Sequence, residues 1–371
     1  SLLFVPPTEG GGMEIIMKMK KAFSVLMIFV LTIMLIPQDI FACDLKDNCQ
    51  SLDAGSDAVL AYYDVKTQTE TLITEDELQA VVSNAQRKRS VDTAEFEPQS
   101  ASEPQEQKLL TKKEKQMFDD AKNNTLEYYG ESQKSTRAID NRSLVSNPQA
   151  DPYYRIAKLY FSETTNAAGT QKAGYMGTGF AVGPNLCATA RHCLTDSYGK
   201  WVTDFKAYYG YNGYNNTYSN CFSNVSGYIY YPQYITGTNA DGTITTDSNY
   251  DVAYVIWGER TVEKTGCFGM SSAISNGMNL RTAGYPGDRD NGYRMYEAYG
   301  SVTSYTDQRL SCDNIYCAGG QSGSPYFDND YYAHGILTHT RMLNSTQVSG
   351  ESSGRRYDYS LIVWLQNNNY V

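Results

Sequence analysis

The sequence predicts that residues 138–371 form an all-β domain that ends in a helix. Short apolar segments rich in Val, Ile, Tyr, Phe and Thr alternate there with clusters of Gly, Asn, Asp and Pro. Short strands separated by frequent turns are typical of a β-barrel or β-sandwich. We expect strands at 156–161, 178–182, 186–190, 205–209, 227–231, 252–257, 279–283, 298–304 and 333–337, and a closing helix over 359–366.

The first third of the chain has a different composition. Residues 1–137 hold 22 Asp and Glu against 15 Lys and Arg, so most of the net charge of −10 lies there. Within residues 43–137, the stretches 75–85 and 108–121 have helical character, but apolar residues are too few for an independent core. We predict that 43–137 is a propeptide, with a plain linker or a surface tether as the alternative. Arg87-Lys88-Arg89 and Arg137 are candidate cleavage sites.

Residues 1–42 are expected to be upstream sequence followed by a signal peptide. Three lysines between positions 18 and 21 precede an apolar run over 22–37, which is short for a membrane span, and Ala42 offers a cleavage point. The protein should therefore be secreted. The segment 40–43 loosely resembles a lipoprotein box, in which Cys43 would be lipidated and the protein would be tethered to the cell surface.

The cysteines and charges narrow the possible partners. Eight cysteines in an exported chain favour disulfide bonds, and six of them lie within residues 138–371. A metal site is less well supported, because Cys312 and Cys317 are too widely spaced for a tight knuckle and have no histidine pair beside them. No basic tract stands out, so we expect no nucleic-acid partner.

Three residues form a candidate catalytic set. The chain has only three histidines, and His192 follows an apolar segment; Asp251 precedes Val-Ala-Tyr-Val, and Ser322 lies in Gly-Gly-Gln-Ser-Gly-Ser-Pro. A serine hydroxyl needs an adjacent base to become nucleophilic, imidazole titrates in the useful range, and a buried carboxylate fixes the imidazole tautomer. The amides of Gly320 and Ser322 are placed to stabilise an oxyanion.

Each of these motifs alone has an ordinary structural explanation. A histidine after a strand is usually a structural residue, a Gly-rich segment with serines is often a turn, and an aspartate before an apolar segment often caps a strand. The combination is much more specific, because the three occur in the order His, Asp, Ser within one predicted all-β region. We therefore predict that His192, Asp251 and Ser322 act together.

Residues 138–371 resemble the bacterial glutamyl endopeptidase branch of the chymotrypsin-like serine proteases. The resemblance rests on Thr-Ala-Arg-His-Cys at 189–193, Tyr-Asp-Val-Ala at 250–253, Gly-Gly-Gln-Ser-Gly-Ser-Pro at 319–325 and His-Gly-Ile at 334–336. Residues 138–142 and 152–155 also resemble the processed N-terminus of that family and the entry to its first strand.

This resemblance implies a fold, an activity and a mode of activation. The fold would be two six-stranded β-barrels of the chymotrypsin type, with the active site in the cleft between them. The activity would be that of a serine endopeptidase with Gly320 and Ser322 as the oxyanion hole, and it would need no metal or cofactor. Activation would follow removal of the propeptide near Arg137.

The specificity pocket is where the chain departs most from the family. Its members hold a substrate carboxylate with a histidine and a hydroxyl, and the matching positions here are Leu337 and Cys317. Leu337 would desolvate a carboxylate without pairing it. A trypsin-like preference for Lys or Arg is not supported either, because Tyr316 stands at the position where an acidic residue would pair with the substrate cation. We expect an altered pocket, formed by the following residues: Tyr316, Cys317, Leu337, Thr338, His339 and Thr340.

Other departures concern the surroundings of the catalytic set. Arg191 stands where a small residue usually precedes the histidine. Gly177 stands where some relatives carry a cysteine that bridges to the position of Cys193. The pairs Cys187–Cys193, Cys221–Cys267 and Cys312–Cys317 are then one of fifteen possible connectivities. In digestive relatives, the N-terminal ammonium freed by activation binds an aspartate, and Gln321 stands at that position here. In the family that this chain resembles, the freed N-terminus packs near the specificity pocket, and we expect Ala138 or Ile139 to do the same.

The predicted function is that of a secreted, monomeric serine endopeptidase that acts on proteins or peptides. A catalytically silent homologue that binds proteins through the cleft is the main alternative, although such homologues usually lack a catalytic residue and this chain has all three. A Tyr-rich adhesin is a weaker alternative, suggested by residues 208–218, because this run contains no repeat.

Overall fold

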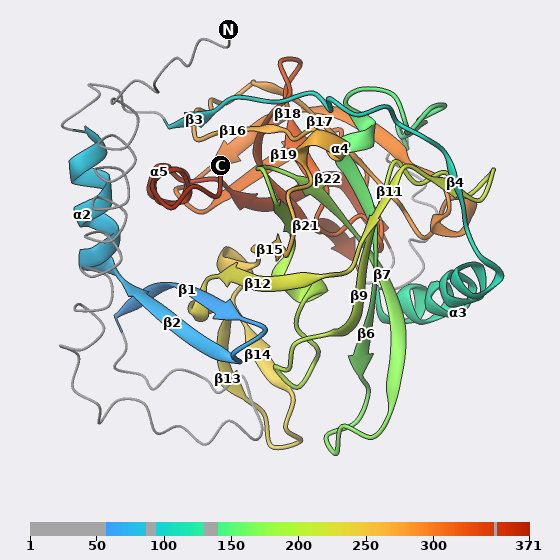
Figure 1. Cartoon of the computed structure of the whole chain (residues 1–371), viewed down its shortest axis with the longest axis horizontal. Coiled ribbons are helices and arrows are strands. Elements are labelled where there is room, and N and C mark those ends of the chain that lie inside the picture. The colour runs from blue at the N-terminus through green and yellow to red at the C-terminus, as the bar shows by residue number, and fades with distance from the viewer. Residues whose placement is uncertain (1–56, 87–93, 130–139, 345–346) are drawn as a thin grey trace, which may run out of the picture. The chain divides into compact units, whose positions relative to one another are not determined.

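The computed structural model describes residues 57–86, 94–129, 140–344 and 347–371 (Figure 1). The predicted signal peptide, Cys43 and the candidate cleavage sites at 87–89 and Arg137 lie outside these residues. Strands predominate in the described part, and the chain has the double-barrel architecture of the chymotrypsin fold that the sequence analysis predicts. All nine expected strands and the closing helix are present.

The first barrel is built on a nine-stranded sheet. The strands follow the order β11-β9-β6-β7-β8-β15-β12-β1-β2. Its elements are β6 (Ile156–Thr164), β7 (Lys172–Ala181), β8 (Leu186–Thr189), β9 (Thr203–Tyr209), β11 (Asn220–Phe222), β12 (Val225–Tyr230) and β15 (Ala253–Trp257), together with β1 (Ala58–Asp64) and β2 (Thr69–Thr74). All neighbouring strands in this sheet are antiparallel.

The second barrel is closed by six strands. Strand β20 (Pro325–Phe327) pairs with β17 (Asn279–Gly284) on one side and with β21 (Tyr332–Asn344) on the other. The circuit is completed by β18 (Tyr296–Tyr305), β19 (Arg309–Asp313) and β22 (Gln347–Arg356). Short strands at the periphery are β3 (Glu95–Phe96), β5 (Ser143–Leu144) and β16 (Gly269–Ser271).

Smaller elements connect the strands. A hairpin of β13 (Ile235–Thr238) and β14 (Ile244–Thr246) precedes β15. Strand β10 (Thr217–Tyr218) pairs with β4 (Lys108–Leu109), and a short helix, α4 (Val262–Thr265), follows β15. Single 3₁₀ turns occur at 153–155, 191–193, 232–234, 248–250 and 290–292.

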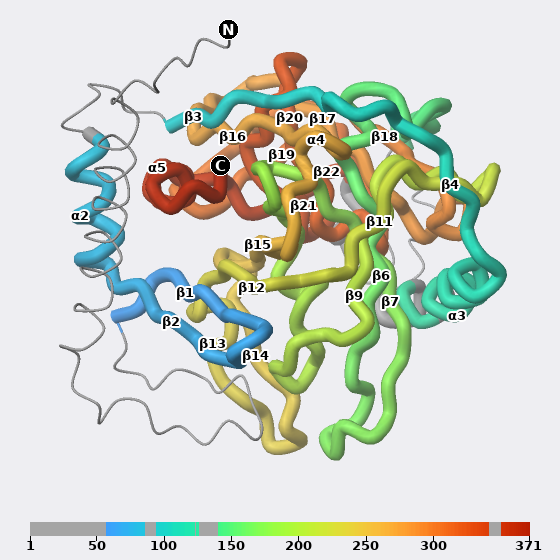
Figure 2. The backbone as a smooth tube through the Cα atoms, in the orientation of Figure 1, coloured from blue at the N-terminus to red at the C-terminus, as the bar shows by residue number. Residues whose placement is uncertain are grey.

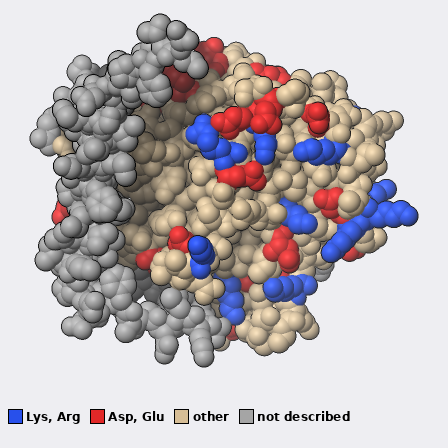
Figure 3. All heavy atoms as spheres, in the orientation of Figure 1, with Lys and Arg blue, Asp and Glu red and all other residues tan. Residues whose placement is uncertain are grey.

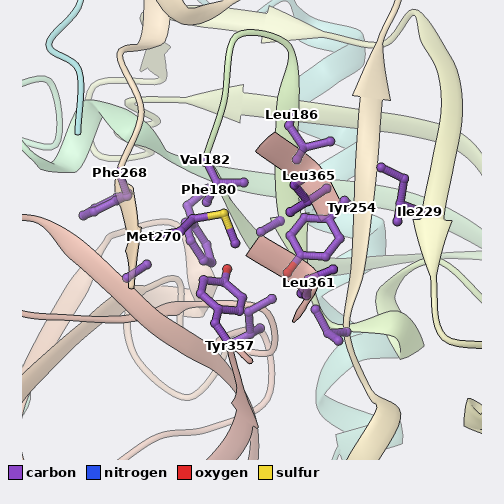
Figure 4. Close-up of a cluster of buried hydrophobic side chains, with 14 of the residues drawn as sticks. Phe180, Val182, Leu186, Ile229, Tyr254, Phe268, Met270, Tyr357, Leu361 and Leu365 are labelled. Carbon is purple, nitrogen blue, oxygen red and sulfur yellow. The ribbon is translucent and has the colours of Figure 1, made fainter. Parts of the chain in front are cut away.

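Helix α5 (Tyr359–Asn367) packs against both barrels. It begins at Asp358, whose carboxylate accepts a hydrogen bond from the Leu361 amide and so caps the helix. Leu361 and Leu365 point from the helix towards Tyr254 of β15 and Leu186 of β8 (Figure 4). The same cluster includes Phe268 and Met270, so one continuous core joins the barrels and orients the strands that carry the candidate site.

Residues 57–86 and 94–129 run along the outside of the barrels (Figure 2). Helix α2 (Glu75–Gln86) packs against α5, and helix α3 (Lys112–Tyr129) packs against β7. Both helices had been expected from the sequence, but α3 begins and ends later than the predicted stretch. The strands β1, β2, β3 and β4 were not predicted. Because β1 pairs with β12 and β3 pairs with β16, this polar segment does not need a core of its own.

Two surface features are relevant to partners. None of the helices in the described residues is both long and apolar enough to cross a membrane. On the face shown in Figure 3, Lys and Arg side chains are interspersed with Asp and Glu rather than gathered in a patch of one sign.

Candidate active site

His192 and Asp251 form a directly bonded pair at one end of the first barrel. Strand β8 delivers the chain to the turn 191–193, and the neighbouring strand β15 begins two residues after Asp251. The His192 ring Nδ1 lies 2.7 Å from Oδ2 of Asp251, and the His192 backbone amide donates to Oδ1 at 3.0 Å. Both carboxylate oxygens are therefore engaged, which fixes the orientation of the carboxylate and of the ring.

The pair has the electrostatics of a base held by a buried carboxylate. Burial lowers the pKa of His192, but the negative charge of Asp251 and its hydrogen bond outweigh this effect, so the pKa lies well above its ordinary value. Burial raises the pKa of Asp251, and the facing imidazole outweighs that effect, so the carboxyl pKa lies below its ordinary value. The arrangement stabilises an ionised Asp251 beside an imidazolium.

Main-chain contacts bring Ser322 to the same region. The Ser322 carbonyl accepts a hydrogen bond from the Thr178 amide of β7 at 2.9 Å. The Sγ of Cys193, the residue that follows His192, lies 3.8 Å from the same carbonyl oxygen. On the other side, the Gly323 amide donates to the Leu337 carbonyl of β21 at 2.8 Å. The serine segment is thus held between strands of the two barrels.

Two glycines make the sharp turn around Ser322 possible. Gly320 and Gly323 have φ angles of +92° and +88°, a backbone conformation that side chains disfavour. A Cβ atom at Gly320 would also lie 2.5 Å from the Tyr285 carbonyl oxygen, and one at Gly323 would collide with the Thr178 carbonyl. These positions require glycine, which explains the Gly-x-Ser-Gly pattern.

The peptide group before Gly320 is anchored from outside the loop. The Gly287 amide donates a 2.7 Å hydrogen bond to the Gly319 carbonyl, and the Gly320 carbonyl accepts one from Thr178 Oγ1 at 2.8 Å. Since the peptide group is planar and trans, the N–H of Gly320 points away from Gly287.

A charged network that the sequence analysis did not single out lies behind this loop. Arg142 binds both carboxylate oxygens of Asp140 and of Asp288, and it also donates to Oε1 of Gln321 at 3.3 Å. Only 1% of the Arg142 side chain is exposed. No pattern in the sequence predicts this network, because Arg142 and Asp288 are 146 residues apart and each belongs to a polar segment.

The residues predicted to form the specificity pocket fall into two groups. Tyr316, Cys317 and Leu337 are buried, and the Arg142 guanidinium lies 4.9 Å from the centre of the Tyr316 ring. Thr338 and His339 bond to each other, with Thr338 Oγ1 2.6 Å from His339 Nδ1.

The second group, Thr338, His339 and Thr340, lies on β21 near the His192–Asp251 pair. His339 is exposed, but its ring interacts electrostatically with both His192 and Asp251. The Thr340 hydroxyl donates to the Glu351 carbonyl at 3.5 Å, across the β21–β22 ladder. Both residues therefore lie on the strand that runs past the His192–Asp251 pair.

The unusual Arg191 has a clear structural explanation. Its guanidinium is buried between the rings of Trp201 and Tyr230, at 3.8 Å and 4.2 Å from their centres. Glu70 of β2 lies close enough for its carboxyl to interact with the same charge, and it accepts a hydrogen bond from the Tyr230 hydroxyl. Arg191 thus turns away from the His192–Asp251 pair and packs beside the β1–β2 hairpin.

His334 has a different role. It is buried, its Nδ1 lies 2.7 Å from the Ala273 carbonyl, and its Nε2 lies 3.0 Å from Oδ2 of Asp328. Both ring nitrogens are therefore used in local structure, within the second barrel.

The cysteine pairings expected from the sequence are not formed. The six cysteines among the described residues, Cys187, Cys193, Cys221, Cys267, Cys312 and Cys317, all carry free thiols. The Sγ atoms of Cys193 and Cys187 lie against Gly177 and Gly179, two successive positions on one face of β7, rather than against each other. Among the described residues, no group of three or more His, Cys, Asp or Glu side chains is arranged to hold a metal ion.

Comparisons with known proteins show what this chain is similar to. Residues 177–336 match the family model for the trypsin-like peptidase domain. The chain is 29% identical over 198 residues to a glutamyl endopeptidase of Bacillus licheniformis, an alignment that covers 53% of this chain and 55% of that protein. It is 26% identical over 193 residues to a Bacillus subtilis protein named extracellular metalloprotease, covering 51% and 56%.

Among solved structures, a Glu endopeptidase in complex with MPD is 20% identical with a TM-score of 0.47, covering 62% of this chain and 97% of that one. The protease Anisep from Arthrobacter nicotinovorans is 18% identical with the same TM-score, covering 62% and 99%. The chain spans about half the length of the curated relatives that it matches.

The fold and the matched domain define the class that this chain resembles: it has a chymotrypsin-type fold, and residues 177–336 are similar to a trypsin-like peptidase domain. Within that class it is glutamyl endopeptidase-like, as the resemblance of residues 138–371 predicted.

Proposed function

We propose that the protein is a serine endopeptidase in which His192, Asp251 and Ser322 form the catalytic triad. The observation that carries the proposal is the His192–Asp251 pair, with its 2.7 Å contact and its second bond from the His192 amide, beside a serine on a glycine-shaped turn. The matched peptidase domain supports the same conclusion.

Each residue of the triad has a distinct role in the proposed reaction. His192 accepts the proton of the Ser322 hydroxyl while the oxygen attacks the substrate carbonyl, and Asp251 stabilises the resulting imidazolium. The amides of Gly320 and Ser322 donate to the oxyanion. His192 then protonates the leaving amine, an acyl-enzyme remains on Ser322, and water hydrolyses it with His192 again acting as the base.

The proposed pocket lacks the means to hold a carboxylate at two important positions. Leu337 is 2% exposed and its side chain cannot donate a hydrogen bond, and Cys317 is packed with it in one apolar cluster. We therefore expect no strict preference for Glu before the scissile bond. Profiling the cleavage of a peptide library by the purified protein tests this expectation, and a strict Glu preference would overturn it.

We further propose that the protein is exported and matures by cleavage near Arg137. The support is the apolar run after the N-terminal lysines, together with the family resemblance of residues 138–142. N-terminal sequencing of the secreted protein, after its chains are separated in denaturant, should give Ala138 as the first residue of the chain that carries Ser322. An active form in which that chain still begins within 43–130 would contradict this proposal.

Labelling of the nucleophile tests the proposed activity directly. A fluorophosphonate should modify the wild-type protein at Ser322, because only an activated serine attacks the phosphorus and displaces fluoride. Ser322→Ala should remove the labelling and the hydrolysis of casein, whereas Ser324→Ala should retain the labelling. If the wild-type protein is folded but unreactive, the alternative of a catalytically silent, protein-binding homologue is favoured.

A further inference from the structure

The buried guanidinium of Arg142 lies behind the loop that carries the proposed nucleophile. All five of its hydrogen bonds go to just three side chains: Asp140, Asp288 and Gln321. The two bonds to Asp288 measure 2.8 and 2.7 Å, so the pairing is bidentate and fixes the relative orientation of the two groups. Such a fully engaged arginine is a rigid connector between segments.

One connection runs through Asp288 to the oxyanion loop. The neighbouring residue, Gly287, donates its amide to the Gly319 carbonyl at 2.7 Å. That bond sets the plane of the 319–320 peptide group, and the plane sets the direction of the Gly320 N–H. Holding Asp288 in place therefore holds the donor that the proposed mechanism needs.

A second connection runs through Gln321, the residue before the nucleophile. Its Oε1 accepts from Arg142 at 3.3 Å and from the Ala318 amide at 3.0 Å. The loop is consequently tied to the guanidinium on both sides of the Gly319–Gly320 peptide. Gln321 is completely buried, so these bonds form in a site that excludes solvent.

We propose that Arg142 is a positioning residue that holds the Gly320 amide in the orientation of an oxyanion donor. This inference rests on the proposed function. In digestive relatives, an aspartate at the position of Gln321 binds a new N-terminal ammonium. In this chain, the Arg142 guanidinium is the cation that binds the side chain at that position, which explains how the loop keeps its shape. Arg142 does not touch the reacting atoms and acts through Asp288 and Gln321.

The test measures the rate at which a fluorophosphonate inactivates the purified, exported protein as a function of pH. The phosphoryl oxygen of this probe occupies the oxyanion hole during attack, whereas the pH midpoint reports the His192–Asp251 pair. Arg142→Gln should lower the plateau rate constant about 10- to 100-fold and leave the pH midpoint unchanged. This decrease is smaller than that caused by removing an oxyanion donor altogether, because the Gly320 amide is still present but less well oriented. For the best peptide substrate, kcat should fall by the same factor while KM changes little.

A matched control is available next to Asp288. Arg289 also pairs with Asp140, but its side chain is half-exposed and no bond links it to the loop 317–322. Arg289→Gln should leave the plateau within about twofold of the wild-type value. Arg142→Lys should lie between the two, because lysine keeps the charge but loses the bidentate geometry.

The outcomes separate this inference from the proposed function. If the wild-type protein does not react at Ser322, both the proposed function and this inference are wrong. If the wild-type protein reacts and folded Arg142→Gln reacts equally fast, only the inference fails. Should Arg142→Gln not fold, Asp288→Asn decides the question, since it keeps the shape and weakens the pair. A plateau unchanged in that variant would overturn the inference, and a lower plateau with the same pH midpoint would support it.

Discussion

At the scale of single residues, small differences in side-chain volume determine the surroundings of the candidate site. Cys193 follows His192 directly, and its Sγ would lie 2.9 Å from a Cβ atom placed on Gly177. In a disulfide of standard geometry, the Cβ of one cysteine lies roughly 3 Å from the sulfur of the other. The missing cross-link at this point therefore reflects one residue, Gly177, and not the path of the backbone.

Gly177→Cys should form a disulfide with Cys193. The bond would close a loop between β7 and the turn after β8, and constraining the unfolded chain in this way should stabilise the protein by about 3 kcal/mol. Thiol titration should show one free thiol fewer than in the wild-type protein, and the thermal midpoint should rise only without reductant. Gly179→Cys, which would face Cys187 instead, is a matched comparison. An unchanged thiol count would contradict the prediction.

The pH dependence of activity should report the charge on His192. The imidazole must be neutral to accept a proton, so the rate should rise as the pH rises through its pKa. Because Asp251 holds that pKa well above the ordinary value, half-maximal kcat/KM should lie above about pH 6.5. A pH–rate profile of peptide hydrolysis measures the midpoint.

Asp251→Asn provides the contrasting case. Without the carboxylate, the midpoint should move to lower pH and the maximal rate should fall by about 10⁴-fold, because the imidazolium and the tautomer are no longer stabilised. Asp241→Asn, on the exposed turn between β13 and β14, should leave both quantities unchanged. An acid limb below pH 6 in the wild-type protein would contradict this account.

At the scale of elements, the helix α3 is held by one aromatic side chain. Phe118 is completely buried, and its ring centre lies 5.1 Å from those of Tyr208 and Tyr211. The ammonium of Lys158 on β6 lies 5.3 Å from the same ring and donates to the Gly292 carbonyl at 2.5 Å. Burial of this ammonium lowers the pKa of Lys158 to about 7. The helix therefore seals a lysine and a cluster of aromatic rings from water.

Phe118→Ala should lower the free energy of unfolding of the full chain by about 3–5 kcal/mol. The change leaves a cavity among Tyr208, Tyr211 and Lys158 and removes the buried ring area. Urea unfolding followed by tryptophan fluorescence measures the loss. Leu109→Ala is the control, because Leu109 is 74% exposed and should contribute little. Equal stabilities of the two variants would show that α3 does not dock in this way.

The elements also show what the sequence could and could not predict. The central strands were found because their apolar runs fit a buried strand, as in Ala253–Trp257, where all five residues are buried. Strands β1 and β3 were not predicted, because β1 lies in the polar first part of the chain and pairs with the distant β12, and β3 has only two residues and pairs with the distant β16. Local pattern carries no information about such distant partners.

The same distinction applies to the site. The proposed triad was found because its motifs are local, and the structure brings His192 and Asp251 into contact across 59 residues. The stacking of Arg191 between Trp201 and Tyr230, and the pairing of Arg142 with Asp288, depend on tertiary packing alone. The cysteine pairings were wrong because an even number of cysteines indicates nothing about the distances between their side chains.

At the scale of the whole molecule, strands from residues 57–86 and 94–129 pair with strands of the barrel sheets. Strand β1 pairs with β12 through four residue pairs from Ala61 to Asp64, and β3 pairs with β16 in the second sheet. Apolar side chains of the segment, among them Leu60 and Phe118, are buried in the same core cluster as α5. Strand addition and apolar burial together resemble a permanent subunit interface rather than a detachable lid.

If the chain is cleaved after Arg137, the fragment containing residues 57–129 should remain bound to residues 138–371. The backbone hydrogen bonds of β1 and the buried side chains do not depend on the covalent link, so they should persist when it is cut. The cleaved protein should elute from gel filtration as one species that contains both chains and separates only in denaturant. Leu60→Asp, which buries a charge in the core, should release the fragment, whereas Leu109→Asp, at an exposed position, should not. A fragment that separates from the wild-type protein without denaturant would show that the paired strands do not hold it.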